Sequence, residues 1–406
     1  MNCGLLGEKL GHSYSPFIHK YLGDYTYSLF EISSDNLGDF LKNGDFHAVN
    51  VTIPYKQAVI PYCASLSPIA FKLGAVNILV RQDDGTLIGH NSDYFGFETL
   101  LLRSGLQVNG KKALVLGTGG AAKTAIASLQ SKGANVVVIS RSGENHYGNL
   151  QLHSDAAVIV NATPVGMYPH TGVSPLSLDL FPQLEGVLDA IYNPARTQLL
   201  LDAEERGLVA MNGLWMLVAQ AKEASEWFTD NKIPDEQIDA LYRILQKQMQ
   251  NIVLIGMPGC GKTTVGKLIA EKTSKKFVDA DKVILEKTGC TAGQIIKDQG
   301  EEAFRKLESQ VLSELGKQSS LVIATGGGCV TREENFQYLH QNGQIFCLHR
   351  ALERLSTEGR PLSQRNSLAE LYRVRQPLYE RFADEHIDNN GDVSQAVSKI
   401  LEIWEG

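Results

Sequence analysis

The chain has 406 residues, of which 43% are hydrophobic and 20% charged, and its formal net charge is −7. This composition is typical of a globular protein of about two to three domains, and the mild negative charge argues against a nucleic-acid backbone as the main partner. Six cysteines are scattered without a C-x-x-C pair, which favours reduced thiols over a disulfide framework or a zinc site.

No apolar run approaches the roughly 18 residues needed to cross a bilayer. The N-terminal stretch MNCGLLGEKLGHSYSP has neither the apolar core of a signal peptide nor the character of a transit peptide. We therefore expect a cytoplasmic protein with no membrane partner. No feature of the sequence indicates an oligomeric state.

Short β-branched runs alternate with amphipathic helical stretches along the chain, which predicts parallel sheets flanked by helices. The predicted strands are ALVLG (113–117), NVVVIS (135–140), AAVIVN (156–161), NIVLIG (251–256), LVIATGGG (321–328) and QIFCLH (344–349).

The first hundred residues carry polar side chains in positions that suit a small substrate. GHSYSP (11–16) places Ser13 and Ser15 before Pro16, a favourable first residue of a helix. Two hydroxyls beside the positive end of a helix can seat a carboxylate, although capping alone would also explain Ser15. Further on, NVTIPYK (50–56) places Thr52 and Lys56 beyond the end of a predicted strand.

The segments GAVN and GHNSD supply Asn77 and Asp93. A lone lysine normally faces solvent. However, reduction of a ketone by hydride transfer requires a proton donor at the carbonyl oxygen, and a lysine in a cleft beside an aspartate can fill that role. Lys56 and Asp93 are therefore candidates for such a pair.

A dinucleotide site is predicted after the strand at 113–117. GTGGAAKTAIASL (117–129) follows that strand and opens a helix, as a dinucleotide loop does, although a G-x-G-G turn can also simply pack a helix onto a strand. The next strand ends in Arg141, where an NAD site would carry an acidic residue for the ribose hydroxyl. A cation there suits the 2′-phosphate, so NADP(H) is favoured over NAD.

Together these segments resemble shikimate dehydrogenase over residues 1–250. The shared pattern comprises S-x-S-P, N-V-T-x-P-x-K, G-A-V-N, N-x-D, G-x-G-G, N-A-T and NGLWMLVAQA (212–221). The resemblance implies that Lys56 and Asp93 are catalytic. It implies a substrate site formed by Ser13, Ser15, Thr52, Asn77, Tyr192 and Gln220. It also implies an NADP site formed by Gly117, Thr118, Gly119, Gly120, Ala121, Arg141, Ala190 and Gly213.

The sequence departs from this family pattern at four places. S-R-S stands at 140–142 in place of N-R-T, and His90 replaces an acidic residue. The segment 142–155 is short and Gly-rich, whereas the family usually has a further helix there that leads into the next strand. Pro164 stands where serine is common. These changes bear on cofactor affinity and on selectivity at the adenosine side, whereas the catalytic pair is retained.

A second site is predicted after the joint between the two halves. A helix opened by Pro234 runs to about residue 249, and a buried strand follows almost at once. GMPGCGKT (256–263) then matches G-x-x-x-x-G-K-[ST] between that strand and the helical TVGKLIAEK. Its backbone N–H groups can hold phosphate oxygens, while Lys262 neutralises phosphate charge and the Thr263 hydroxyl ligates Mg²⁺.

The phosphate acceptor is indicated by charged residues that follow. FVDADK presents Asp279 and Asp281, one suited to the metal and the other to a substrate hydroxyl, and Asp281 can also cap the following helix. Arg305 and Arg375 suit a small carboxylate because a guanidinium matches its geometry. The polar, irregular segment 355–366 has the character of a mobile lid.

Residues 251–406 resemble shikimate kinase through the Walker A loop, D-x-D, F-R, G-G-G, R-P-L and R-x-P-L-Y. The resemblance implies a nucleoside-monophosphate-kinase-like fold with Lys262 and Asp281 catalytic. It implies that shikimate is held by Asp281, Arg305, Gly327 and Arg375. It implies that the nucleotide is held by Gly259, Cys260, Gly261, Thr264 and the lid residue Arg360, with Arg354 as a second contact. Thr263 and Asp279 would hold the metal.

The predicted fold is α/β: an N-terminal substrate lobe with a Rossmann-type NADP domain, followed by a P-loop domain of the nucleoside-monophosphate-kinase type. The expected domains are 1–95 with the helices of 213–250 packing back, 96–212, and 251–406. The first half would reduce 3-dehydroshikimate with NADPH, and the second would phosphorylate shikimate with ATP and Mg²⁺. No feature predicts a tunnel, so we expect shikimate to be released between the steps.

Two alternatives remain open. A quinate/shikimate dehydrogenase working in the catabolic direction would be indicated by NAD preference, against which Arg141 argues. A sensor with one inactive half would be indicated by loss of a catalytic residue, but Lys56, Asp93, Lys262 and Asp281 are all present. A general P-loop ATPase is disfavoured because LVIATGGG ends in glycines and not in a Walker B acid.

Overall fold

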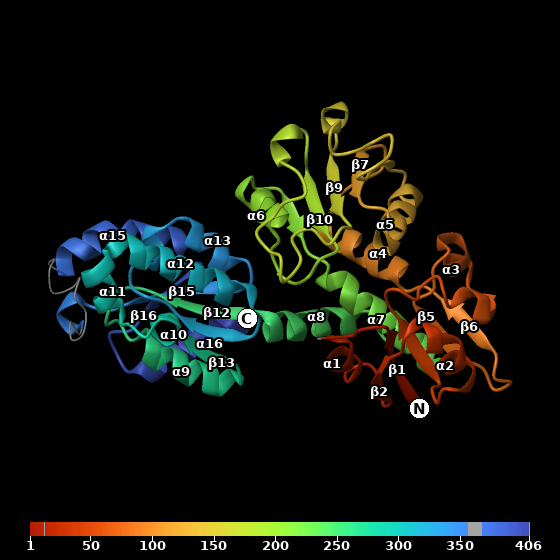
Figure 1. Ribbon diagram of the computed structural model, residues 1–406, viewed down its shortest axis with the longest axis horizontal. Coiled ribbons are helices and arrows are strands. Elements are labelled where there is room, and N and C mark those ends of the chain that lie inside the picture. Colours follow the sequence, from red (N-terminus) through yellow and green to blue (C-terminus); the bar gives the residue numbers. More distant parts are fainter. Residues whose placement is uncertain (12, 356–367, 406) are drawn as a thin grey trace. The chain divides into compact units, whose positions relative to one another are not determined.

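The computed structural model describes residues 1–11, 13–355 and 368–405, which form two compact units (Figure 1). Unit 1 comprises Met1–Gly166, Val173–Tyr192 and Leu199–Leu245, and unit 2 comprises Met167–Gly172, Asn193–Gln198 and Gln246–Gly406. The division falls inside α8 (Glu236–Met249), the helix that the sequence predicts up to about residue 249. None of the described helices is long and apolar enough to cross a membrane.

The N-terminal lobe of unit 1 is built on a mixed six-stranded sheet in the order β2-β1-β3-β5-β6-β4. β1 pairs in parallel with β2 and β3, whereas β5 is antiparallel to both β3 and β6. The strands are β1 (Asn2–Gly7), β2 (Thr26–Glu31), β3 (Ala48–Val51), β4 (Cys63–Leu66), β5 (Ile78–Arg81) and β6 (Leu87–His90). The short helices of this lobe are α1 (Ser15–His19), η1 (Ser34–Asn36), α2 (Leu37–Asn43), η2 (Ile60–Tyr62) and α3 (Pro68–Leu73).

The second lobe of unit 1 has a fully parallel sheet in the order β8-β7-β9-β10-β11. Its strands are β7 (Lys112–Leu116), β8 (Asn135–Ile139), β9 (Val158–Asn161), β10 (Gly186–Asp189) and β11 (Val209–Met211). The chain reverses its direction of winding between β7 and β9, and in such sheets ligands bind at the carboxyl ends of the strands beside this reversal. The predicted strands at 113–117, 135–140 and 156–161 are confirmed with small shifts at their ends.

Helices cover both faces of this parallel sheet, as Figure 1 shows for α4 and α5 on one side and α6 on the other. Alternate residues of β7 accordingly belong to two cores: Ala113 and Val115 pack with α4 and α5, and Leu114 and Leu116 pack with α6. Burial on both faces explains the unbroken apolar run in the sequence. The helical elements are α4 (Asp93–Ser104), α5 (Gly120–Ser131), η3 (Leu150–His153), η4 (Leu178–Leu180) and α6 (Gln198–Glu205).

One long helix, α7 (Leu214–Thr229), returns from the second lobe to the first. Its Ala224 and Phe228 are buried in a core with Cys3, Ala48 and Ile78 of the first sheet. The C-terminal part of α7 therefore packs against the first sheet.

Unit 2 contains a parallel five-stranded sheet in the order β13-β14-β12-β15-β16. Its strands are β12 (Asn251–Ile255), β13 (Lys276–Asp279), β14 (Leu321–Ala324), β15 (Gly343–His349) and β16 (Glu385–Asp388). Figure 1 shows α12, α13 and α15 on one side of the sheet and α9 and α16 on the other. The helical elements are α9 (Lys262–Thr273), α10 (Ala280–Thr288), α11 (Ala292–Gln299), α12 (Glu301–Lys317), η5 (Cys329–Thr331), α13 (Glu334–His340), η6 (Leu352–Arg354), α15 (Leu368–Phe382) and α16 (Val393–Glu405).

Two local predictions are wrong. Asp279, not Asp281, caps α10: its side chain accepts a hydrogen bond from the Asp281 backbone N–H, because the helix begins earlier than the sequence suggests. The capping explanation for Ser15 also fails, since Ser15 lies inside α1 and Tyr14 occupies the cap without a side-chain bond.

Candidate active sites

The predicted catalytic pair of the first half is formed. Lys56 Nζ lies 2.6 Å from Asp93 Oδ2, and Asn77 Nδ2 donates to Asp93 Oδ1 at 3.0 Å. The Asp93 side chain is 11% exposed and that of Lys56 is 25% exposed. The lysine is therefore held by a carboxylate on one side and remains accessible to a small molecule on the other.

Local structure explains why these three residues meet. Asn77 directly precedes β5, and its backbone C=O accepts from Val51 N–H at the end of the neighbouring β3. Asn77 Oδ1 also accepts from the backbone N–H of Ser92 at 2.8 Å, which fixes the start of α4. Asp93 occupies the first turn of that helix, where the dipole favours a negative charge.

The predicted substrate hydroxyls lie in segments that follow the carboxyl ends of two neighbouring strands of the first sheet. β1 and β3 are parallel neighbours, so the segments after them, which carry Ser13 and Thr52, leave the sheet at one edge. Ser13 Oγ accepts from the Ser15 backbone N–H at 3.2 Å. Tyr14, between the two serines, has its ring 6.3 Å from that of Tyr192 in an edge-to-face arrangement. Burial, and secondarily Tyr14, raises the pKa of Tyr192, which keeps its phenol neutral and able to donate a hydrogen bond.

Gln220 lies where α7 crosses α4, one turn of α4 from Asp93. A Cβ added at Gly96 of α4 would lie 2.7 Å from Met216 O and 3.1 Å from Gln220 Cβ. The two helices therefore approach closely at Gly96, in the turn that follows Asp93. The Gln220 side chain donates to Leu217 O at 3.0 Å in this structure.

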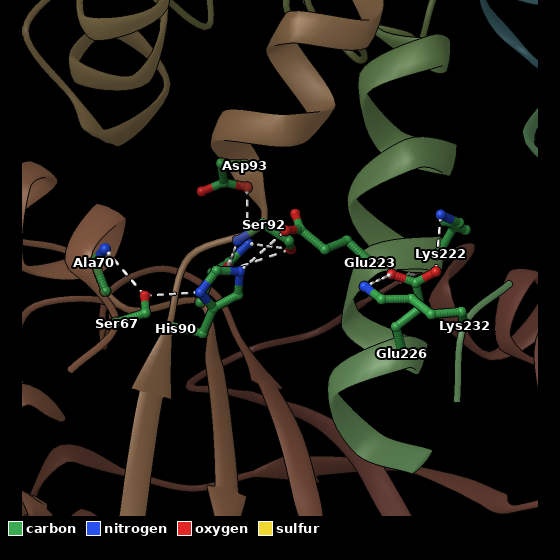
Figure 2. A network of polar contacts seen from close by, with 10 residues as sticks. Ser67, Ala70, His90, Ser92, Asp93, Lys222, Glu223, Glu226 and Lys232 are labelled. Carbon is green, nitrogen blue, oxygen red and sulfur yellow. Dashed lines mark hydrogen bonds and ion pairs between the residues drawn. The ribbon is translucent and has the colours of Figure 1, made fainter. Parts of the chain in front are cut away.

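His90, the departure from an acidic residue, is directed at α7 and not at the nucleotide loop. Figure 2 shows its ring between Ser67 and Glu223, with Nδ1 2.7 Å from Ser67 Oγ and Nε2 3.2 Å from Glu223 Oε1. The ring also stacks on Trp227, with 4.2 Å between centroids. His90 thus ties the end of β6, just before Ser92, to the helix that carries Gln220.

The predicted dinucleotide loop has the expected geometry at the carboxyl end of β7. Gly117 has a φ of 105°, and its N–H donates to Ile139 O of the neighbouring β8. Gly119 precedes α5 and provides no side-chain cap for the helix. A Cβ at Gly119 or Gly120 would meet nothing within 4 Å, so open space lies beside the helix N-terminus. Thr118 is exposed and Ala121 half-buried at this loop.

Arg141 is exposed just beyond β8, the strand beside the loop. Its charge also acts on the half-buried Tyr147, whose pKa burial raises and Arg141 lowers. The short segment after it is held by a bridge between Ser140 and His146 and by the 3-10 turn η3. A cation therefore lies next to the position at which a ribose phosphate would extend from the loop.

The sequence motifs did not indicate a role for Asp189 in this lobe. Asp189 and Asn161 end neighbouring strands, are fully buried, and are joined by an Asn161 Nδ2–Asp189 Oδ1 hydrogen bond of 3.1 Å. Asp189 also accepts from Ile191 N–H, which shapes the turn that carries Ala190 and Tyr192. The signal was an acid at the end of an apolar strand, GVLD.

Ala190 and Gly213 lie in contact. A Cβ at Gly213 would be 2.2 Å from Ala190 O, so the start of α7 can approach this turn only with glycine. Both residues lie near the carboxyl end of β10. The nucleotide loop lies at the same end of this parallel sheet, after β7.

In unit 2, the loop after β12 requires its glycines. Gly256, Gly259 and Gly261 have φ angles of 133°, 84° and 101°, which residues with a Cβ rarely adopt. Lys262 is 8% exposed, and its Nζ donates to the carbonyl oxygens of Gly256 and Met257 at 2.8 and 3.0 Å. The Cys260 backbone N–H donates to Met257 O, and its thiol side chain is buried away from the space a nucleotide would occupy.

This loop opens into a cavity of about 390 Å³ that brings most of the predicted kinase residues together. Its lining includes Gly259, Gly261, Lys262, Thr263, Thr264, Asp279, Asp281, Arg305, Gly327 and Arg375. Thr263 Oγ1 donates to Asp279 Oδ2 at 2.9 Å. A hydroxyl and a carboxylate in contact beside the phosphate loop are the hard oxygen ligands that suit Mg²⁺. Arg360 lies outside the described residues.

Glu308, also missed from the sequence, holds Arg305 in the cavity. Arg305 Nη1 donates to the fully buried Glu308 at 2.7 Å, and Nη2 donates to Glu301 at 3.0 Å. Burial alone would lower the pKa of Arg305, but the charges and hydrogen bonds of the two glutamates raise it. Burial raises the pKa of Glu308, opposed by Arg305. The i, i+3 spacing on α12 was the available signal.

Among the described residues, two polar atoms of this pair have no hydrogen-bond partner: Arg305 Nε and Glu308 Oε1. Buried polar atoms left without partners beside a cavity indicate a place where a polar ligand can complete them. Across the cavity, Arg375 is 5% exposed and its Nη1 donates to Gly327 O at 3.1 Å. Arg350, which the sequence did not single out, also lines this space.

The family model for the shikimate dehydrogenase substrate-binding domain matches residues 5–79, and the shikimate kinase model matches residues 258–405. A shikimate dehydrogenase (NADP(+)) of Clostridium perfringens strain SM101 is 35% identical over 265 residues, covering 60% of this chain and 97% of that protein. The chain belongs to the shikimate dehydrogenase family. A shikimate kinase domain follows in the same polypeptide, so two shikimate-pathway activities are combined in one chain.

Other relatives and solved structures agree on the dehydrogenase family. A shikimate dehydrogenase of Methanothermobacter thermautotrophicus is 35% identical over 275 residues, covering 60% of this chain and 96% of that protein. A chorismate mutase/shikimate 5-dehydrogenase fusion from Clostridium acetobutylicum matches with a TM-score of 0.57 and 35% identity, covering 61% of this chain and 97% of the other. A shikimate 5-dehydrogenase from Thermus thermophilus, solved with NADP(H) and shikimate, matches with a TM-score of 0.55 and 30% identity, covering 60% and 99%.

Proposed function

We propose that this bifunctional enzyme catalyses two consecutive reactions. In the first, NADPH reduces 3-dehydroshikimate to shikimate; in the second, ATP phosphorylates the shikimate 3-hydroxyl. The observation that carries the proposal is the presence, in one chain, of a lysine–aspartate pair beside a dinucleotide lobe and of a phosphate loop beside two buried arginines. The product of the first reaction is the substrate of the second.

In the dehydrogenase, Lys56 donates a proton to the substrate carbonyl oxygen, and Asp93 orients Lys56 through their 2.6 Å contact. Asn77 holds Asp93 in place. NADPH supplies the hydride when it is bound on the loop 117–121. The carboxylate and hydroxyl groups of the substrate are bound by Ser13, Ser15, Thr52, Tyr192 and Gln220.

The adenosine end of this cofactor is bound by Arg141, whose guanidinium fits the 2′-phosphate. The N-terminus of α5, which has no side-chain cap, would hold the phosphates through its backbone N–H groups. Ala190 and Gly213, which lie against each other, would contact the nicotinamide end. This arrangement supports NADP(H) over NAD, and thus a biosynthetic over a catabolic direction.

In the kinase, Arg305 and Arg375 bind the shikimate carboxylate, and Asp281 positions the hydroxyl that accepts the phosphate. Lys262 must leave the carbonyls of Gly256 and Met257 to reach phosphate oxygens, a short movement of a flexible side chain. Thr263 and Asp279 would hold Mg²⁺, which would supply positive charge to the phosphates. Gly259, Cys260, Gly261 and Thr264 would hold ATP; Arg360, the expected contact to the transferred phosphate, lies outside the described residues.

We assign residues 1–95, with the helices of 213–250, to the substrate lobe of the dehydrogenase. Residues 96–212 form its NADP lobe and 251–406 the kinase. Helix α4 begins at Asp93 and so crosses the first of these boundaries, whereas α8 ends at Met249, just before the last.

One incubation with 3-dehydroshikimate, NADPH, ATP and Mg²⁺ tests the proposal, with NADPH absorbance followed and the products identified by mass. Shikimate 3-phosphate formed with NADPH and ATP consumed one for one is the expected result. NADPH loss that stops at unphosphorylated shikimate would contradict the kinase assignment. Phosphorylation of added shikimate without NADPH oxidation would contradict the dehydrogenase assignment. Oxidation of NADH at the same rate as NADPH would favour the quinate-type alternative.

A further inference from the structure

Three side chains outside both active sites form a group with the chemistry of a metal ligand set. Cys347, His349 and His386 each offer one ligand atom, and these atoms all lie within 4.8 Å of one another. None of the three has a role in binding shikimate or ATP in the proposal above. They come from β15 and β16, at the edge of the unit 2 sheet.

Strand register explains why the three meet. β15 and β16 are parallel neighbours, and Cys347 is the register partner of His386. His349 follows Cys347 at the i+2 position, so its side chain leaves the same face of the sheet. A sulfur and two imidazoles therefore point to one side of adjoining strands, near the ends at which both strands stop.

The ligand atoms lie close enough for a small adjustment to place them around a single ion. His349 Nε2 and His386 Nδ1 face each other 2.7 Å apart, with the rings tilted by 35°. Two ligands of one tetrahedral zinc ion lie about 3.3 to 3.6 Å apart, given bonds of about 2.0 to 2.3 Å. A small rotation of the exposed His386 ring relative to the half-buried His349 ring would open the nitrogen pair to that separation.

The outer nitrogen of His386 already has the partner that metal-bound histidines commonly use. His386 Nε2 lies 3.2 Å from Glu380 Oε2 of α15. A carboxylate on the far nitrogen fixes the tautomer, so that Nδ1 carries the lone pair toward His349. This second contact comes from a different element than the two strands, and it orients the ring for ligation.

An ion can also reach the group. The His386 side chain is 39% exposed, whereas Cys347 is 1% exposed and forms the closed end of the site. Cys347 and His349 line a cavity of about 230 Å³ together with Gly256 and Arg350. Arg350, next to His349 in the chain, also lines the cavity that holds Lys262.

We propose that Cys347, His349 and His386 bind a divalent ion of borderline softness, with zinc as the expected species and water as the fourth ligand. Thiolate and imidazole are ligands for zinc, whereas Mg²⁺ prefers oxygen, so this site is separate in chemistry from the Thr263–Asp279 pair. The bound ion restrains the end of β15 from which Arg350 extends toward the phosphate loop. Zinc can thereby act on the kinase without entering its active site.

The test uses the full-length protein, freed of metal with a chelator, and needs no enzyme activity. Zn²⁺ is added in competition with a chromophoric chelator, and Co²⁺ is added in a parallel titration as a spectroscopic probe. The expected result is one tightly bound ion per chain, together with an ultraviolet thiolate-to-cobalt charge-transfer band that saturates at one equivalent. Absence of that band at saturating Co²⁺ would overturn the proposal, because it excludes Cys347 as a ligand.

Substitutions then identify the ligands. Cys347→Ala removes the charge-transfer band, His386→Gln lowers zinc affinity at least tenfold, and Glu380→Gln lowers it about tenfold through the histidine it orients. The matched controls are Cys290→Ala for the thiol and the exposed His170→Gln for the imidazole, and both retain the parent affinity. Unchanged zinc affinity in Cys347→Ala and His386→Gln, with circular dichroism showing both folded, would also overturn the proposal.

Discussion

At the scale of single residues, Lys56 shows how structure narrows a weak sequence signal. A lysine after a strand is ordinarily a surface charge, but here it touches Asp93, which Asn77 and the start of α4 hold in turn. Three segments that are distant in sequence converge on one ammonium group. Such convergence holds the ammonium group in place at a partly accessible position, an arrangement that suits the proposed proton transfer.

Replacing the lysine tests its role. We expect Lys56→Met to lower the dehydrogenase kcat by roughly 10² to 10⁴-fold, because general acid catalysis contributes about that much. The KM for 3-dehydroshikimate should change far less, and phosphorylation of shikimate by the same preparation serves as the internal control. A variant that keeps kcat within tenfold of the parent would show that another group donates the proton.

Arg141 determines cofactor choice in this proposal. Arg141→Ser should raise the KM for NADPH by about 10 to 100-fold, since a hydrogen bond to a charged group contributes about 1.5 to 3 kcal/mol. The KM for NADH should hardly change, because NADH lacks the 2′-phosphate. Lys132→Ser, at the opposite end of α5, is the control. An equal loss for both cofactors would mean that Arg141 supports the fold and does not read the phosphate.

At the scale of helices and strands, α12 provides both a substrate residue and the residue that positions it. Arg305 is bound by Glu308 one turn later and is thereby aimed into the cavity of unit 2. Because Glu308 is fully buried, its charge in the low-dielectric interior is stabilised chiefly by that pairing, with a smaller contribution from Arg375.

We therefore expect Glu308→Gln to raise the kinase KM for shikimate about tenfold while leaving the KM for ATP unchanged. The amide keeps the shape but loses the charge that fixes the guanidinium. Glu314→Gln, an exposed position on the same helix paired with Lys287, is the matched control. Equal effects on both substrates would instead indicate general damage to unit 2.

The packing of α1 against β2 and α7 predicts a pH dependence of stability. His19 is 1% exposed and stacks between Tyr27 and Phe228, with centroids 4.0 and 5.6 Å away. Burial lowers the pKa of His19 from 6.5 to about 3. In the unfolded chain it binds a proton below about pH 6.5, whereas in the folded protein it stays neutral. The contribution of the buried, neutral His19 to the stability of the folded protein is therefore fully present above pH 6.5. It is lost as the pH falls from 6.5 toward 3.

When the pH is lowered from 6.5 to 5, His19 should lower the free energy of unfolding by about 2 kcal/mol, since one pKa unit corresponds to about 1.4 kcal/mol. Denaturant unfolding of the parent and of His19→Phe at both pH values isolates the effect, since other groups titrate alike in both proteins. On lowering the pH, the His19→Phe variant should lose about 2 kcal/mol less unfolding free energy than the parent. The control His170→Phe, at an exposed position, should show the same loss as the parent. Identical pH slopes in parent and His19→Phe would refute the assignment.

At the scale of the whole molecule, the described residues of the two candidate active sites lie in separate compact units. Lys56 and its partners lie in unit 1, while the phosphate loop and both arginines lie in unit 2. Each site is assembled from residues of its own unit. The chemistry of each half therefore does not require the other, and the link between them is the shared intermediate.

We predict that shikimate made by the first half exchanges with the surrounding solution before phosphorylation. In a reaction started with 3-dehydroshikimate, NADPH and ATP, an excess of isotopically labelled shikimate should dilute the unlabelled shikimate 3-phosphate in proportion to the pool. A lag should precede its appearance when no shikimate is added. Formation without a lag and without dilution would demonstrate direct transfer.

Much of this protein was readable from the sequence because its chemistry resides in short motifs. G-x-x-x-x-G-K-T, N-V-T-x-P-x-K and G-x-G-G each fix a backbone shape locally, through glycine conformations or helix starts, and their placement after strands follows from parallel α/β topology. Both family resemblances and both activities were predicted from these motifs and are confirmed. The roles of individual site residues remain predictions.

Tertiary structure alone decided which residues hold the functional groups in place. Asp189, Glu308 and His90 act through partners that lie 28, 3 and 133 residues away. Asp189 and Glu308 had local signals, an acid at the end of an apolar strand and a spacing on a helix, but neither signal names the partner. The candidate zinc ligands had none: lacking C-x-x-C, the sequence argued against zinc, but two parallel strands bring Cys347 and His386 into register. Local backbone shape is encoded by neighbours in the chain, whereas side-chain partnership depends on the packing of distant segments.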